Sequence, residues 1–168
     1  MIVAPIETTR LKLVPRTLEE VRVQVSEMNA DERAQLSADW LARLESPTVD
    51  HWTLGFSIVQ KELDEVVGVC GYKGPPGADG TVEIAYGLFK DFREQGYATE
   101  AAAALVASAF SDDRVRAVRA HTFSQANASA RVLTKCGFQA VGEVYDPADG
   151  WVWRWEKVDT LSRRGTER

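Results

Sequence analysis

Residues 93–100, with the sequence R-E-Q-G-Y-A-T-E, are the segment of this chain whose residue types point most directly to chemistry. They follow a run at 82–88 whose alternating apolar residues predict a half-buried strand, and they open an alanine-rich segment with helical spacing at 98–109. The first N–H groups of a helix have no partners within it and lie at the positive end of its dipole, so they bind anions. Gly96 lets the backbone approach a ligand closely, and Ala98 keeps the first turn thin. The segment therefore predicts a site for the diphosphate of a nucleotide-type ligand.

A second motif lies at residues 127–138, where N-A-S-A-R-V-L-T-K-C-G-F predicts a short capped helix that ends at Gly137. Together, and in this order, the two motifs resemble those of the GNAT superfamily of acetyl-CoA-dependent N-acetyltransferases. The sequence of the second motif resembles the one found in the branch that contains the ribosomal-protein N-terminal acetyltransferases. The resemblance also includes I-E-T-T-R-L-K-L at residues 6–13, so it covers nearly the whole chain.

The resemblance implies that acetyl-CoA binds between two neighbouring central strands that splay apart. The backbone at Leu88 and Phe89 would bind the pantetheine arm like an added strand, which leaves the thioester near the end of the strand that carries Glu83. The diphosphate would be held, mostly through backbone N–H groups, by Arg93, Gln95, Gly96, Tyr97, Ala98 and Thr99. This chain departs from the family pattern at Glu94 and Gln95, where relatives often carry Gly, Arg or Lys. An exposed carboxylate beside a diphosphate costs about 1 kcal/mol, which would lower affinity.

Glu83 stands where GNAT enzymes that use a strand glutamate as a base carry that residue, ten positions before Arg93. An amine attacks a thioester only as the free base. Deprotonating a lysine side chain at neutral pH costs about 4 to 5 kcal/mol, whereas an α-amine costs only about 1 kcal/mol. Three roles stay open for Glu83, which are direct base, base through a water molecule, and attraction of the cation. The alternative is a structural glutamate paired with a neighbouring strand.

The departing CoA thiolate, with a pKa of about 8.5 by analogy with cysteine, benefits from a proton donor. Many GNAT enzymes use a tyrosine at the position that aligns with Leu133, and leucine cannot donate a proton. In the branch resembled here, Ser129 is the substitute hydroxyl, and Asn127 would bind the pantetheine arm or fix the start of the helix. Asn and Ser are also ordinary residues in a first helical turn.

Other polar and aromatic residues have simpler interpretations. Histidine titrates near neutral pH, but His121 is interpreted as a hydrogen-bonded structural residue. The three tryptophans at 151, 153 and 155 share one face of the last expected strand. Such a stripe is typical of a core or of a contact between two copies of a chain, so a homodimer is one expectation, and lining of an acceptor pocket is another.

The elements that must position these residues follow from periodicity and capping signals. The expected order is strand 10–14, helix 18–28, a helical segment from about 31 or 37 to 44, strands 52–58, 66–72 and 82–88, helix 98–109, strand 115–122, helix 127–136, and strands 139–145 and 151–158. This order predicts an α/β (α+β) fold with a GNAT-like mixed, mostly antiparallel central sheet and helices on both faces. We expect one domain at 1–158 and a polar, frayed tail at 159–168.

Composition excludes several classes of protein. A chain of 168 residues is one domain by length, and a net charge of -5 argues against a nucleic-acid binder, which needs clustered Lys and Arg. The start lacks a basic segment followed by an apolar core, and no apolar run is long enough to cross a bilayer, so we expect a cytoplasmic protein with no membrane partner. The two cysteines fit neither a disulfide framework nor a metal site, so no metal is expected.

The resemblance implies an acetyl-CoA-dependent N-acetyltransferase that acts by direct transfer in a ternary complex, with a protein N-terminus or a small-molecule amine as acceptor. Two other classes stay open. Leu133 and Glu94 motivate a catalytically weak acyl-CoA-binding or sensing module. A generic nucleotide-binding domain would instead be stabilised by ATP or NAD.

Overall fold

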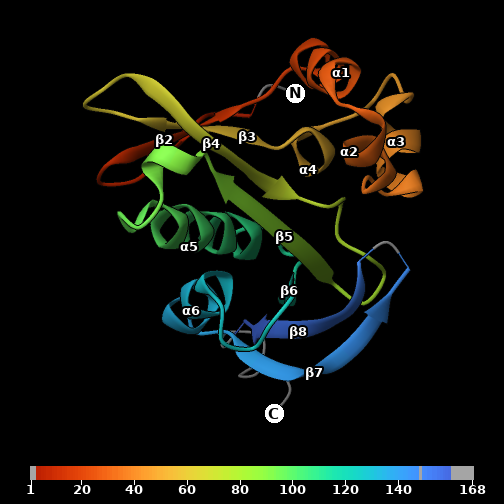
Figure 1. Ribbon diagram of the computed structural model, residues 1–168, viewed down its shortest axis with the longest axis vertical. Coiled ribbons are helices and arrows are strands. Elements are labelled where there is room, and N and C mark those ends of the chain that lie inside the picture. Colours follow the sequence, from red (N-terminus) through yellow and green to blue (C-terminus); the bar gives the residue numbers. More distant parts are fainter. Residues whose placement is uncertain (1–2, 148, 160–168) are drawn as a thin grey trace.

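An eight-stranded sheet in the order β1-β2-β3-β4-β5-β6-β8-β7 organises the chain (Figure 1). The computed structural model describes residues 3–147 and 149–159. The strands are β1 (Ile6–Glu7), β2 (Leu11–Pro15), β3 (Phe56–Gln60), β4 (Glu65–Tyr72), β5 (Thr81–Leu88), β6 (Ala117–Thr122), β7 (Gln139–Asp146) and β8 (Gly150–Val158). All neighbours pair antiparallel except β5 and β6, which are parallel. The predicted mixed, mostly antiparallel sheet is confirmed.

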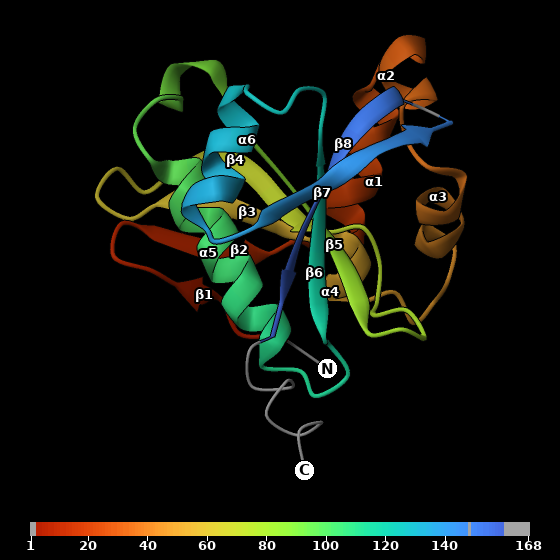
Figure 2. The same cartoon turned by 90° about the horizontal axis from the view of Figure 1, so that it is seen from below.

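The helices lie on both sides of the central strands, with α5 and α6 on one side and α2, α3 and α4 on the other (Figures 1 and 2). They are α1 (Leu18–Glu27), α2 (Ala30–Ala34), α3 (Ala38–Leu44), α4 (His51–Leu54), the short 3-10 helix η1 (Lys90–Phe92), α5 (Tyr97–Phe110) and α6 (Ala128–Lys135). The alanine stripe lets α5 approach the sheet closely, since Ala101, Ala102 and Ala109 are fully buried. The phenol of Tyr72 on β4 donates to the Leu105 carbonyl at 2.6 Å, which joins the helix to the sheet.

The parallel pairing of β5 and β6 is short and then opens. Its register runs from Thr81 opposite Ala117 to Glu83 opposite Arg119 and stops there, although β5 continues to Leu88. Beyond that point β5 stays paired with β4, and β6 stays paired with β8. The sheet therefore divides into two halves that diverge from the level of Glu83, with α5 and α6 beside the opening (Figure 1).

One predicted strand begins in the wrong place. Trp52 and Leu54 were expected in the strand 52–58, but they belong to α4, and β3 starts only at Phe56. The Asp50 side chain accepts from the Trp52 N–H at 3.1 Å and begins a helical turn, and Gly55, with φ +70, ends it. Before Phe56 the expected alternation contains only Trp52 and Leu54, which are too few to distinguish a strand from one helical turn, so the capping residue decided the structure.

Several other boundaries follow the predicted signals. Thr17 caps α1 through the Glu20 N–H, as its spacing indicates, and the second helical segment divides into α2 and α3, with Ser37 as the cap of α3. Gly137, with φ +85, follows α6 as predicted, and the N–H of the next residue, Phe138, returns to the Leu133 carbonyl at 3.0 Å. Strand β6 starts at Ala117 rather than 115, because a turn occupies the preceding residues. Of the predicted tail at 159–168, the Asp159 N–H donates to the Arg116 carbonyl at 3.0 Å, and residues 160–168 lie outside the described residues.

Candidate active site

The predicted anion-binding turn has a backbone shape that suits the purpose. Gly96 is the N-cap of α5 with φ +82, and Glu94 is also left-handed, with φ +65. Gly96 has no side chain to cap the helix, so the first N–H groups of α5, at residues 97–99, are left for a ligand. Arg93, Gln95 and Gly96 are exposed, whereas the Tyr97 side chain is buried and can offer a ligand only its N–H. The structure thus brings the predicted diphosphate residues into one exposed loop at a positive helix end.

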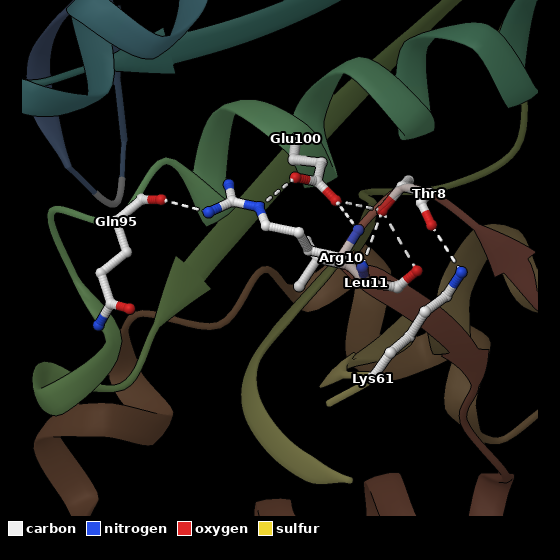
Figure 3. Close-up of polar contacts among 6 residues, drawn as sticks. All are labelled: Thr8, Arg10, Leu11, Lys61, Gln95 and Glu100. Carbon is white, nitrogen blue, oxygen red and sulfur yellow. Dashed lines mark hydrogen bonds and ion pairs between the residues drawn. The ribbon is translucent and has the colours of Figure 1, made fainter. Parts of the chain in front are cut away.

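A polar cluster fixes this loop to the N-terminal segment (Figure 3). The Arg10 guanidinium donates from Nε to Glu100 Oε1 at 2.8 Å and from Nη1 to the Gln95 carbonyl at 2.8 Å. Its Cζ atom lies 4.5 Å from the centre of the Tyr97 ring. The Thr8 hydroxyl donates to the other oxygen of Glu100. Sequence reasoning missed this contact, although Arg10 lies in the segment 6–13 that carries part of the family resemblance.

The opening beside β5 exposes alternate backbone groups of that strand. In an antiparallel ladder each residue directs its N–H and C=O to one side, and neighbouring residues direct them to opposite sides. The Phe89 N–H donates to the Val67 carbonyl of β4 at 2.9 Å, and its own carbonyl accepts from Phe92. The groups that face the opening therefore belong to Tyr86 and Leu88. Leu88 stands where it was predicted, although its carbonyl accepts from Arg93 Nε at 3.2 Å, and the backbone of Phe89 is used within the chain.

Glu83 lies where the two halves of the sheet separate, and two basic side chains contact it. Its Oε2 atom is 2.8 Å from Nζ of Lys73, which follows β4, and 3.1 Å from Nδ1 of His121 on β6. Burial would raise the pKa of Glu83, but the hydrogen bond from His121 and the charge of Lys73 outweigh it, and the pKa lies below its ordinary value. Glu83 is therefore an ionised carboxylate at neutral pH.

His121 is held in one tautomer by a residue on β8. Arg154 donates from Nε to Nε2 of His121 at 3.1 Å, and a guanidinium has no acceptor. Nε2 is therefore the unprotonated nitrogen of a neutral ring, and Nδ1–H donates to Glu83. The interpretation of His121 as a hydrogen-bonded residue agrees with these contacts, but sequence reasoning did not find that its partner is Glu83.

On the helical side of the opening, a strand tyrosine meets the second motif. The Tyr86 hydroxyl lies 3.0 Å from Ser129 Oγ and 3.2 Å from the Ser129 carbonyl. Burial raises the pKa of Tyr86, so the phenol keeps its proton at neutral pH. Leu133 is fully buried, whereas Asn127 caps α6 by accepting from the Ala130 N–H at 2.8 Å. Tyr86 was not a predicted site residue, because its place in the apolar alternation of this strand gave no functional signal.

A cavity of about 470 Å³ opens on the sheet face opposite α5. Its wall includes Lys73, Ala85 and Gly87 next to the opening, the apolar side chains of Leu36 and Trp40, and Asp149 from the turn between β7 and β8. Of the tryptophan stripe, Trp155 is buried and donates to Thr122 at 2.9 Å, while Trp151 is 66% exposed. The stripe does not line this cavity. The cavity can hold a small amine or the end of a chain, beside Lys73, the ion-pair partner of Glu83.

Comparison with known proteins identifies the family. The sequence pattern of the acetyltransferase (GNAT) domain matches residues 9–139. The chain belongs to the GNAT family. The matched segment of this GNAT chain contains both predicted motifs, β5 and β6, Glu83, and Arg10 with its partners Gln95 and Glu100.

The GNAT chain is similar to an uncharacterised N-acetyltransferase, p20, of Bacillus licheniformis, with 32% identity over 91 residues, which are 54% of this chain and 51% of that protein. It spans about half the length of the curated relatives it matches. Among solved structures, it resembles RimL, a ribosomal L7/L12 alpha-N-protein acetyltransferase in complex with coenzyme A, with a TM-score of 0.66, 18% identity and coverage of 92% and 97% of the two chains. It also resembles AAC(6')-Ib in complex with ribostamycin and coenzyme A, with a TM-score of 0.65, 17% identity and coverage of 94% and 98%. At these identities the structures show a shared fold.

Two kinds of feature are absent from the described part of this GNAT domain. Across residues 3–147 and 149–159, no helix is long and apolar enough to cross a membrane. Within that same part of the chain, no group of three or more His, Cys, Asp and Glu side chains could hold a metal ion. Cys70 and Cys136 are free and buried.

Proposed function

We propose that this protein is an acetyl-CoA-dependent N-acetyltransferase that moves an acetyl group directly to a primary amine in a ternary complex. One observation carries the proposal: the opening between β5 and β6 has an anion-binding helix end at one side and the ionised carboxylate of Glu83 at its base. Family membership and the coenzyme A named with two similar structures support it. A cytoplasmic location is part of the same proposal.

The acetyl donor would bind through the backbone along the opening. Leu88 and Tyr86 offer the strand groups for the pantetheine arm, with Asn127 near it at the start of α6. Arg93, Gln95, Gly96, Tyr97, Ala98 and Thr99 form the loop and helix end for the diphosphate. The fit of this loop is supported by Gly96, which permits the left-handed turn before α5 and leaves room for the Arg10 guanidinium, since a Cβ built there would lie 3.2 Å from Arg10 Nη2.

The acceptor amine would enter from the cavity and approach Glu83. Because the pKa of Glu83 is lowered, the carboxylate attracts the ammonium strongly but takes its proton weakly. An acceptor with a low amine pKa needs the least help, which favours an α-amine, whose deprotonation costs only about 1 kcal/mol at neutral pH. The nitrogen lone pair attacks the thioester carbonyl, the C–N bond forms, the C–S bond breaks, and the amine proton leaves through Glu83 to solvent.

Acetyl transfer scored by mass spectrometry against a mixed library of peptides and small amines tests this function. Amide products at peptide N-termini or on small amines support it and separate the two acceptor classes. Binding of coenzyme A without turnover on the whole library would instead support the sensing module. Thermal stabilisation by ATP or NAD but not by coenzyme A would support the generic nucleotide-binding domain.

We expect the pair of Tyr86 and Ser129 to protonate the departing thiolate. Tyr86→Phe removes the phenol that lies between β5 and α6, and turnover with acetyl-CoA should fall about 10² -fold, the lower end of the range for a positioned proton donor. Ser129→Ala should cause a smaller loss. With an acetyl thioester of a more acidic thiol as donor, the loss of turnover in Tyr86→Phe should be smaller, because that leaving group needs no proton.

Steady-state kinetics with both thioesters measure this, and Tyr145→Phe, a change at an exposed tyrosine on β7, is the control. An equal deficit with both thioesters would show that Tyr86 does not act on the leaving group.

Glu94 is expected to weaken donor binding. Replacing it with Gly removes a carboxylate from the diphosphate loop and also the cost of about 1 kcal/mol for a left-handed non-glycine residue. Glu94→Gln removes only the charge. Titration calorimetry with coenzyme A should show a several-fold lower Kd for both variants, and only Glu94→Gly should also raise Tm. Unchanged Kd values would mean that the carboxylate points away from the diphosphate.

A further inference from the structure

We infer that Arg10 is a positioning residue for donor binding, which sets the direction of the peptide between Gln95 and Gly96 in the diphosphate loop. The inference rests on the proposed function and adds to it a residue from the other end of the chain. Arg10 directly precedes β2, and the loop that it contacts lies 85 residues later.

The first observation is that three consecutive loop residues surround one guanidinium. Nη1 donates to the Gln95 carbonyl at 2.8 Å. Nη2 lies 3.2 Å from the point where a Cβ of Gly96 would stand, and Cζ lies 4.5 Å from the centre of the Tyr97 ring. Figure 3 shows the Arg10 side chain reaching from the segment before β2 to the carbonyl of Gln95, with Glu100 of α5 beside it.

The second observation concerns the geometry of that peptide. In a planar trans peptide, the C=O and the following N–H point in opposite directions. Because the Gln95 carbonyl is directed at Arg10, the Gly96 N–H is directed away from Arg10, in the sense of a donor for an anion on the other side of the loop. Gly96, with φ +82, permits a peptide flip that most residues would resist. A flip would present a carbonyl where an anion needs an N–H, and the bond from Arg10 opposes that flip.

The third observation is that Arg10 is itself fixed. Glu100 accepts from Arg10 Nε at 2.8 Å through Oε1 and from the Arg10 backbone N–H at 2.8 Å through Oε2, and the Thr8 hydroxyl donates to Oε2 as well. Burial would raise the pKa of Glu100, but the hydrogen bonds from Thr8 and Arg10 lower it, so the carboxylate is ionised at neutral pH. The Lys61 ammonium donates to the Thr8 carbonyl at 2.6 Å, which holds the N-terminal segment in place.

These contacts separate a positioning role from a role in stability. The side chains of Arg10 and Glu100 are 41% and 19% exposed, and ion pairs near the surface add little to folding stability. The loss of Arg10 should therefore change ligand binding much more than thermal unfolding.

The test compares Arg10→Met and Arg10→Lys with the parent protein, using acetyl-CoA and the truncated donor S-acetylpantetheine, which lacks the diphosphate. We expect KM for acetyl-CoA, and Kd for coenzyme A by calorimetry, to rise at least tenfold in Arg10→Met, with kcat little changed. Arg10→Lys should lie between, since one ammonium would have to replace both the Nε bond to Glu100 and the Nη1 bond to the Gln95 carbonyl. With S-acetylpantetheine, all three proteins should have the same kcat/KM. Arg114→Met, which removes an exposed arginine paired with Asp112, is the matched control.

An equal deficit with both donors in Arg10→Met would overturn the inference, because Arg10 would then act on the fold and not on the diphosphate loop. Unchanged binding of coenzyme A would overturn it as well. A parent protein that binds coenzyme A without turnover contradicts the proposed enzyme activity but leaves this inference open to support from the Kd values alone. A parent that binds no coenzyme A refutes both.

Discussion

Gly96→Glu is expected to raise the Kd for coenzyme A at least a hundredfold while the protein stays folded. Three effects combine at this residue. A left-handed φ of +82 costs a non-glycine residue about 1 to 2 kcal/mol. The new Cβ would stand 3.2 Å from Arg10 Nη2, so Arg10 must shift. The added carboxylate would then compete with the diphosphate for the N–H groups at the start of α5. Calorimetry with coenzyme A, together with circular dichroism for the fold, measures the effect.

Gly150→Glu is the matched control for this change. Gly150 has nearly the same φ, +78, but a Cβ there would meet nothing within 4 Å, and the residue is the first of β8. The Gly150→Glu variant should lose about as much folding stability as Gly96→Glu and keep the affinity of the parent protein for coenzyme A. If Gly96→Glu binds coenzyme A as tightly as the parent, the loop does not hold the diphosphate and the proposed donor site is wrong.

Glu83→Gln should reduce kcat/KM for the amine acceptor by about 10² to 10³ at neutral pH, within the range for a positioned acid–base group. The amide keeps the shape of the carboxylate but neither attracts the ammonium nor accepts its proton. Part of the activity should return at high pH, where the acceptor is already a free base. As pH is lowered, kcat/KM of the parent protein should fall with the pKa of the acceptor amine. Glu83 does not set this fall, because its pKa is lowered and it is ionised well below neutral pH.

Linkage gives a second measurement on the same variant. A carboxyl group whose folded-state pKa is depressed contributes stability above its unfolded pKa and loses it as pH falls through the folded value. Glu83→Gln should therefore lower Tm at neutral pH and have less effect in acid. Glu156→Gln is the control, since Glu156 on β8 is ion-paired with Arg119 and is 28% exposed, against 22% for Glu83. A pH profile of Glu83→Gln that matches that of the parent would remove Glu83 from the mechanism.

Local signals in the sequence predicted most elements of this fold. The alanine stripe of α5, the Thr17 cap and Gly137 each depend on residues close in sequence, and all three have the predicted places. The prediction of a strand at Trp52–Leu54 was wrong. Two apolar residues in so short a segment fit a strand and a helical turn equally well, and the Asp50 cap selected the helix.

The site was less readable because its side chains meet through the order of the strands. Lys73 reaches Glu83 since β4 pairs with β5, and His121 reaches it since β6 lies on the other side. Neither neighbour follows from composition or spacing. The same holds for Tyr86, whose contact with Ser129 spans 43 residues, and for the Arg10 contacts, which span 85 residues or more.

The short pairing of β5 and β6 has a consequence for how the protein avoids unwanted association. Beyond Glu83, the edge of β5 away from β4 is a sheet margin that no longer pairs with β6. Unpaired margins of this kind bind strands of other chains and start aggregation. Here the margin faces the other half of its own sheet, which begins with β6 and β8. A strand of a second chain would have to pass between the two halves of the sheet to pair with it, so this margin is less open to foreign strands than the outer edges of the sheet at β1 and β7.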